Sequence, residues 1–252
     1  ASIMRGQNPL HFVVNRILRI YPGLWAALCV TVLTSGIWFS NLSIFEFLTQ
    51  GQTWKYLLKN GALLYPGSLE WLLPGTLIGV PLDRGDGGTI NGSLWTLPWE
   101  LKMYILLLLS FIVTKILAKY LMPKSGIEHI SFRVSMLAIA TYTVGYDLCL
   151  TIFANHNLPH HMFAMFCSGA AILSTNIDLT KIWRFGLGAL IPIILISIFS
   201  PTSFLPFYIV TIPWVVLSAA YVPIIALFAY NKIGDYSYGV YIYAFPVQQW
   251  CA

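Results

Sequence analysis

A succession of long apolar runs constrains this chain more than any other feature. The runs cover Pro22–Ser40, Leu94–Val113, Val134–Leu150, His161–Thr175, Trp183–Ser200, Phe204–Tyr230 and Tyr236–Ala252. Hydrophobic residues make up 58% of the chain and charged residues 9%, whereas soluble domains carry about 25% charged residues. An α-helix crosses a bilayer with about 20 apolar residues. We therefore predict an all-α fold, a polytopic transmembrane helical bundle with about seven spans that forms one integral-membrane domain over residues 1–252.

Charged residues in the loops predict the orientation of this bundle. The basic residues that support it lie before the first run and in alternate loops: Arg5, Arg16, Arg19, Lys115, Lys119, Lys124, Arg133, Lys181, Arg184 and Lys232. Cytoplasmic loops carry such an excess, so the N-terminal end is predicted to be cytoplasmic. The net charge of +5 is therefore interpreted as a determinant of topology rather than as a nucleic-acid surface.

The long segment Asn41–Asn91 is predicted to have structure of its own outside the cytoplasm. Its first part has the apolar and aromatic pattern of short interfacial helices. Gly61–Pro81 is apolar but is interrupted by prolines and glycines. We expect this part to be a partly re-entrant extracytoplasmic loop that lies over a pocket rather than a full crossing.

Glu100 is the most unusual residue, because it places a carboxylate inside an apolar run. Such a charge at mid-membrane costs about 2.5–3.5 kcal/mol on insertion scales. Tyr104 follows four residues later and shares its helix face, whereas Lys102 faces elsewhere. A hydrogen-bonded Glu–Tyr pair suits binding of a sugar hydroxyl or acid–base chemistry. The alternative is structural: Glu100 caps the helix or neutralises a buried cation.

Arg16 and Arg19 lie three residues apart and therefore share a helix face. They could anchor the helix by reaching lipid phosphates. They could instead form a paired clamp for an anionic group, because the planar guanidinium matches phosphate and carboxylate.

The remaining polar residues favour no metal site. His156, His160 and His161 fall in the loop Asn155–His161, where we expect a solvated cluster, with acceptor contact or weak metal binding as alternatives. The cysteines show no C-x-x-C spacing and are predicted to be buried free thiols, with no disulfide framework. The tyrosines of Gly234–Tyr243 suggest an interfacial aromatic belt in which Ser237 and Tyr238 are the pocket candidates.

Three stretches of the chain resemble signatures of the membrane acyltransferase 3 family. Gly92-Ser93-Leu94-Trp95-Thr96-Leu97, with Glu100 and Tyr104, fits G-S-L-W-T-L-x-x-E-x-x-x-Y. Arg16-Ile17-Leu18-Arg19, followed by Tyr21-Pro22, fits R-x-x-R with an aromatic residue and proline. Gly234–Ile242 fits G-x-x-S-Y-x-x-Y-[LI]. They occur in the family's order and extend the resemblance from about Phe12 to Gln249.

The resemblance implies a bacterial inner-membrane O-acyltransferase. An acyl group, most often acetyl, would pass from acyl-coenzyme A as co-substrate, with no bound cofactor, to a hydroxyl of a cell-surface glycan or lipid-linked sugar. Arg16 and Arg19 would then bind the donor at the cytoplasmic side. Glu100 would be the catalytic residue. The acceptor pocket would be lined by Asn91, Ser93, Trp95, Tyr104, Ser237 and Tyr238.

Two expectations qualify this assignment. Family members carry an earlier helix with an Arg and, about ten residues later, a His taken as the catalytic base. Nothing before Arg16 supplies that helix, so the sequence is interpreted as an internal fragment, incomplete at both ends and inactive alone. The arginine pair and Glu100 are also expected at opposite ends of their helices, up to about 30 Å apart. The rival functions are a transporter or flippase for a lipid-linked sugar and a non-catalytic membrane scaffold.

Overall fold

The computed structural model describes residues 8–64, 69, 70, 72–75, 89–121, 128–153, 158–175, 177–222 and 236–252. The regular elements in these ranges are helices, as predicted. They belong to two compact units. Unit A comprises Pro9–Tyr104 and Ile233–Ala252, and unit B comprises Ala1–Asn8 and Ile105–Lys232.

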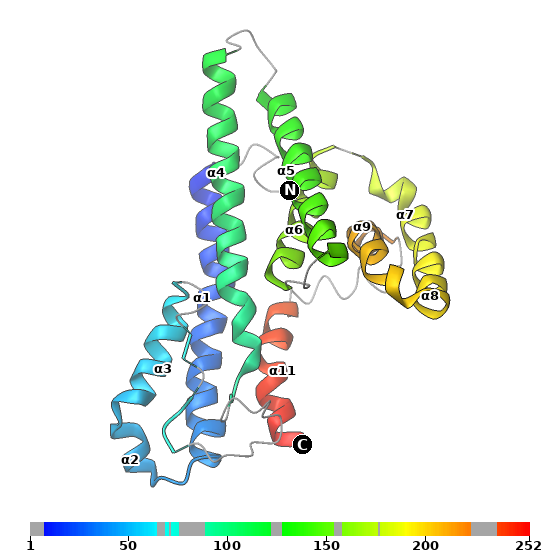
Figure 1. Ribbon diagram of the computed structural model, residues 1–252. Coiled ribbons are helices and arrows are strands. Elements are labelled where there is room, and N and C mark those ends of the chain that lie inside the picture. The colour runs from blue at the N-terminus through cyan, green and yellow to red at the C-terminus, as the bar shows by residue number, and fades with distance from the viewer. Residues whose placement is uncertain are drawn as a thin grey trace. The chain divides into compact units, whose positions relative to one another are not determined.

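Unit A is built around the long helix α1. Its elements are α1 (Pro9–Thr31), the π-turn η2 (Val32–Gly36), α2 (Ile44–Thr49), α3 (Gly51–Ala62), the 3₁₀ turn η4 (Gly92–Thr96), the first two turns of α4 (Leu97–Leu121) and α11 (Ser237–Cys251). Helix α1 packs against both α3 and α11 (Figure 1). Helix α11 also packs against η4. Segments from both ends of the chain therefore meet on α1.

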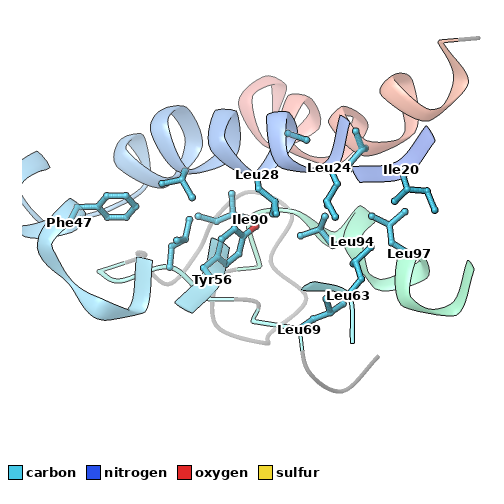
Figure 2. Close-up of a cluster of buried hydrophobic side chains, with 14 residues drawn as sticks. Ile20, Leu24, Leu28, Phe47, Tyr56, Leu63, Leu69, Ile90, Leu94 and Leu97 are labelled. Carbon is cyan, nitrogen blue, oxygen red and sulfur yellow. The ribbon is translucent and has the colours of Figure 1, made fainter. Parts of the chain in front are cut away.

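The core of unit A lies along one face of α1. Ile20, Leu24 and Leu28 recur every four residues and project from the same side of the helix (Figure 2). They pack in one buried cluster with Leu94 and Leu97, which come from η4 and the start of α4. Helix α4 therefore begins beside the middle of α1 rather than beyond its end.

Helices α2 and α3 confirm that short helices occupy the first part of Asn41–Asn91. Ser43 and Glu46 form a reciprocal capping box that starts α2. Glu70 lies 3.3 Å from both Lys55 and Lys59, which ties the following segment back to α3. The interfacial position of these helices stays a prediction. Residues 65–68, 71 and 76–81 of the predicted re-entrant loop lie outside the described residues.

Unit B is a set of packed helices around α9. It contains the rest of α4 together with α5 (Glu128–Phe153), α6 (Leu158–Ser174), α7 (Leu179–Gly188), α8 (Leu190–Phe199) and α9 (Pro201–Ala220). Helices α5 and α6 pack closely on each other, and α9 contacts α5, α6, α7 and α8 (Figure 1). The buried residues between α5 and α6 are Phe132, Met136, Ala140, Cys167 and Ala171. Cys167 is therefore a buried thiol, but Cys29, Cys149 and Cys251 are exposed, which corrects the prediction.

The prediction of about seven spans is wrong for the described residues. By length and composition, three helical stretches there could cross a membrane: Pro9–Gly36, Phe132–Phe153 and Pro201–Ala220. One predicted run fails because its helix is interrupted, and two others because their helices are short. Trp183–Ser200 is divided at Ala189 between α7 and α8, each of 10 residues. Helix α6 has 17 residues and α11 has 15, which is shorter than a typical span.

The first span also starts earlier than predicted. We expected it at Pro22, with Arg16 and Arg19 outside it. Pro22 instead lies inside α1, and the apolar stretch reaches back to Pro9. Both arginines are therefore part of a candidate span, where a charged group requires a partner.

Candidate functional site

A single tyrosine hydroxyl joins the two predicted site groups. Glu100 lies in the first turn of α4, and Tyr104 follows one turn later on the same face. The Tyr104 hydroxyl donates a hydrogen bond of 2.5 Å to Oε1 of Glu100. The same hydroxyl accepts one of 3.4 Å from Nη1 of Arg16 in α1. The three side chains thus form one chain of hydrogen bonds from guanidinium to carboxylate, which we call the Arg–Tyr–Glu relay.

Two aromatic rings hold the Arg16 end of the relay in place. The guanidinium carbon lies 4.8 Å from the centre of the Tyr104 ring and 5.3 Å from that of Phe12. These two rings meet edge to face, with centroids 6.2 Å apart and planes at 85°. Cation–π contacts of this kind contribute about 0.5–2 kcal/mol, more when they are desolvated. The guanidinium is therefore held by the hydrogen bond of its Nη1 and by these two rings.

This geometry corrects the expected distance between the two groups. Arg16 and Glu100 were predicted to lie up to about 30 Å apart, at opposite ends of their helices. They share one tyrosine hydroxyl instead. The reason is the packing of Leu94 and Leu97 on the middle of α1, which starts α4 at the level of the arginine.

Helix α11 is fixed to this site by polar contacts with η4. Asn91 Nδ2 donates to the Ile242 carbonyl at 3.2 Å, and Asn91 Oδ1 accepts from the Ser93 amide at 3.1 Å. The Tyr241 hydroxyl donates to the Ser93 carbonyl at 2.8 Å and is also hydrogen-bonded to the Thr96 hydroxyl. Asn91 and Ser93 were predicted to bind substrate, and here the contacts they make join α11 to η4.

Tyr238 brings a second phenol to the site. Its ring lies against α1 where Gly23 leaves room, because a Cβ on Gly23 would be 2.8 Å from the ring. The Tyr238 hydroxyl is buried and has no hydrogen-bond partner among the described residues, and Arg16 Nε is in the same condition. A buried donor without a partner costs about 1–3 kcal/mol. Each is a buried donor that a bound hydrogen-bond acceptor would satisfy.

The other predicted site residues lie around this cluster in less buried positions. Arg19 is exposed on α1, Trp95 is half-buried in η4 and Ser237 is exposed in the first turn of α11. Lys102 is exposed, with its ammonium 5.0 Å from the centre of the Trp99 ring. It takes no part in the relay.

Thr96 and Tyr241 are contact residues that the sequence interpretation missed. The signal was present, because Tyr238 and Tyr241 are three residues apart and therefore share a helix face. This spacing alone does not distinguish the two tyrosines from a general aromatic belt.

The histidine cluster was also misplaced. His160 and His161 lie in helix α6 rather than in a loop, and His156 lies outside the described residues. His161 is buried, with 7% of its surface exposed, and Nδ1 lies 3.0 Å from Oδ2 of Asp147. The prediction of a solvated cluster is therefore wrong for His161, and Asp147 was not recognised as its partner.

Comparison with known proteins found no matching family model, no matching curated protein and no matching solved structure. The functional assignment therefore depends on the site geometry and on the three sequence stretches described above.

Proposed function

We propose that the Arg–Tyr–Glu relay is the active site of a membrane O-acyltransferase. In this proposal an acyl group, most often acetyl, passes from acyl-coenzyme A to a hydroxyl of a cell-surface glycan or lipid-linked sugar. The observation that supports it most is the position of Tyr104, whose hydroxyl lies between the Arg16 guanidinium and the Glu100 carboxylate. This arrangement provides a base, a proton carrier and a fixed positive charge at one place.

In the proposed reaction Glu100 acts first as a base and then as an acid. The Glu100 carboxylate takes the proton of the acceptor hydroxyl, whose oxygen attacks the carbonyl carbon of the thioester. The carbon–sulfur bond then breaks, and the leaving thiolate takes up the proton from Glu100. The products are the acylated glycan and free coenzyme A.

The two buried donors without partners suit the intermediate of this reaction. Attack on the thioester places a negative charge on the carbonyl oxygen. Arg16 Nε and the Tyr238 hydroxyl can each donate a hydrogen bond to an oxyanion. Removing one donor of this kind costs about 10²–10³-fold in rate in a well-studied hydrolase. Arg19, on the exposed side of α1, is proposed to bind phosphates of the donor.

The shared hydroxyl also changes how the two substrates must meet. Sites at opposite membrane faces would require the acyl group to travel through the bundle. With Arg16 and Glu100 in one relay, the thioester and the acceptor hydroxyl bind side by side, and no separate carrier is needed. The setting is a multi-pass membrane protein, which the three candidate spans support. The bacterial inner membrane and a cytoplasmic N-terminal end remain part of the proposal.

The decisive experiment compares two carboxylate-to-amide substitutions in the protein as its host encodes it. We expect Glu100→Gln to abolish glycan acylation, measured by mass spectrometry of the surface glycan, while membrane insertion is unchanged. Glu46→Gln is the matched control, because Glu46 is exposed on α2 and glutamine also completes a capping box. Unchanged acyl content in Glu100→Gln would refute the assignment.

A further inference from the structure

Unit B contains a buried acid–base pair that the proposed reaction does not use. Asp147 lies in α5 and is fully buried, and His161 lies in α6 with 7% of its surface exposed. Oδ2 of Asp147 is 3.0 Å from Nδ1 of His161. The pair therefore links two neighbouring helices from inside the bundle.

The surroundings of this pair are apolar and aromatic. The ring of Tyr208, from α9, stacks on His161 with centroids 6.0 Å apart and planes at 21°. Helices α5 and α9 are two of the three candidate spans. The pair thus lies where a bilayer would surround the unit if both helices cross it.

Among the described residues, the helices that carry or face the pair bring tyrosines, a histidine and a cysteine to this part of unit B, and Arg133 lies farther along α5. Helix α5 contributes Tyr146, which contacts His160 of α6 with ring centroids 5.5 Å apart. Helix α6 also carries Cys167, and α9 contributes Tyr208. Neither α6 nor α9 contains Lys, Arg, Asp or Glu. Arg133 of α5 is 14 residues from Asp147, or about 21 Å along the helix.

One oxygen of Asp147 is left unsatisfied by the described residues. Oδ1 is buried and has no hydrogen-bond partner in the part of the chain that the structure describes. An ion pair in such a place is an expensive structural link, since buried ion pairs are often no better than apolar residues of the same volume. The carboxyl and the imidazole can instead hold one proton between them, either as carboxylate with imidazolium or as carboxylic acid with neutral imidazole. The second form removes both charges from the apolar interior.

We propose that Asp147 and His161 form a proton-binding site inside unit B. The pair holds one proton as a carboxylic acid beside a neutral imidazole and releases it to water, which leaves the aspartate carboxylate and the neutral imidazole, and the reverse step restores the pair. Ionisable residues that pair within membrane segments commonly mark proton relays. This site is independent of the Arg–Tyr–Glu relay and would stand if the acyl-transfer proposal failed.

Infrared difference spectroscopy tests the proposal on the purified full-length protein in liposomes. The pH is changed between about 5 and 8, the range in which histidine changes charge. We expect wild-type protein to show a carboxylic-acid C=O band that shifts when aspartate carries ¹³C. The band should disappear in Asp147→Asn and change in His161→Gln. It should remain in His160→Gln, the matched control from the adjacent position on α6.

Two results would overturn the proposal. One is a wild-type spectrum with no aspartate-dependent band, a measurement that requires no variant to fold. The other is a band that remains in Asp147→Asn or is unchanged in His161→Gln, because a pair that only holds helices together would not control a protonation signal.

Discussion

Nη1 of Arg16 lies 3.4 Å from the hydroxyl of Tyr104, although 88 residues separate them in the chain. The hydroxyl also donates to Glu100, so one oxygen atom connects a guanidinium on α1 with a carboxylate on α4. An intramembrane charge is tolerated when it is paired within the bundle. The relay therefore gives Arg16, which lies in a candidate span, a link through Tyr104 to the Glu100 carboxylate.

Removing the Tyr104 hydroxyl should show whether acyl transfer depends on the hydrogen bonds of the relay or only on the packing of the ring. Tyr104→Phe keeps the ring that lies 4.8 Å from the guanidinium, but it breaks both hydrogen bonds of the relay. We expect the rate of acyl transfer to fall on the order of 10²-fold, since positioned proton transfer contributes that much or more. The protein should still insert and purify as wild type.

A tyrosine on the same helix provides the control for this experiment. Tyr120 of α4 is exposed, so Tyr120→Phe should leave the acylation rate unchanged. Equal rates in Tyr104→Phe and wild type would show that the relay is only structural.

Gly23 should be required because the Tyr238 ring occupies the space beside it. In Gly23→Ala the new Cβ would lie 2.8 Å from Cε1 and 3.1 Å from Cδ1 of Tyr238, so the ring must move. Overpacking of this kind costs about 1–3 kcal/mol. We expect a several-fold loss of acyl transfer together with a lower melting temperature in detergent.

The matched substitution for Gly23→Ala is Gly239→Ala on α11. A Cβ at Gly239 meets nothing within 4 Å. Alanine is the better helix residue by about 0.5–1 kcal/mol, so this variant should be as stable as wild type or more so. If both alanine variants had the same acyl-transfer rate and melting temperature, the contact between Gly23 and Tyr238 would not be needed for function.

Local chemistry of the site could be predicted from the sequence. Glu100 and Tyr104 are four residues apart, and helix geometry alone places them on one face, where the structure has them hydrogen-bonded. The choice of Arg16 followed from its three-residue spacing to Arg19 and from the resemblance of Arg16-Ile17-Leu18-Arg19 to a family signature. Such arguments hold because they depend on spacing within one helix.

Relationships between helices could not be predicted in the same way. The distance from Arg16 to Glu100 depends on where α4 starts along α1, and the packing of Leu94 and Leu97 decides that. Asp147 was overlooked for the same reason, because its partner lies 14 residues away on the next helix. The hydropathy of Trp183–Ser200 shows that the run is apolar. It does not show that the helix is interrupted at Ala189, between α7 and α8.

The capping box at α2 predicts a specific response to pH. Hydrogen bonds from the Ser43 side chain and amide lower the pKa of Glu46 below its ordinary value of 4.5. A carboxyl with a lowered pKa stabilises the folded state above its unfolded pKa, and this contribution is lost as the pH falls through the folded value. We therefore expect the start of α2 to loosen below about pH 4.5.

Nuclear magnetic resonance of the ¹³C-labelled Glu46 carboxyl provides the measurement. Its titration midpoint should lie below 4.5 in wild type and move up toward 4.5 in Ser43→Ala, which removes the hydroxyl donor. The same midpoint in both proteins would contradict the capping box.

Phenylalanine at position 56 should make the folded protein at least as stable as tyrosine does. Its ring is almost fully buried in the core of unit A, and its hydroxyl has no hydrogen-bond partner among the described residues. Burial also raises the pKa of this phenol above the ordinary value of 10. Because an unpaired buried hydroxyl costs about 1–3 kcal/mol, Tyr56→Phe should leave the melting temperature unchanged or raise it. Tyr56→Ala should lower stability by about 3–5 kcal/mol, since it empties the same space.

The pH dependence of stability at alkaline pH separates the contribution of the Tyr56 hydroxyl from that of its ring. A group whose pKa is raised by folding stabilises the native state fully below its unfolded pKa and loses that contribution as the pH rises toward the folded value. Wild type should therefore lose stability above about pH 10 more steeply than Tyr56→Phe, which has no proton to release there. Thermal unfolding followed by tryptophan fluorescence at several pH values measures both slopes. A Tyr56→Phe variant that melts well below wild type at neutral pH would mean that the hydroxyl has a partner and that the core around α3 is organised differently.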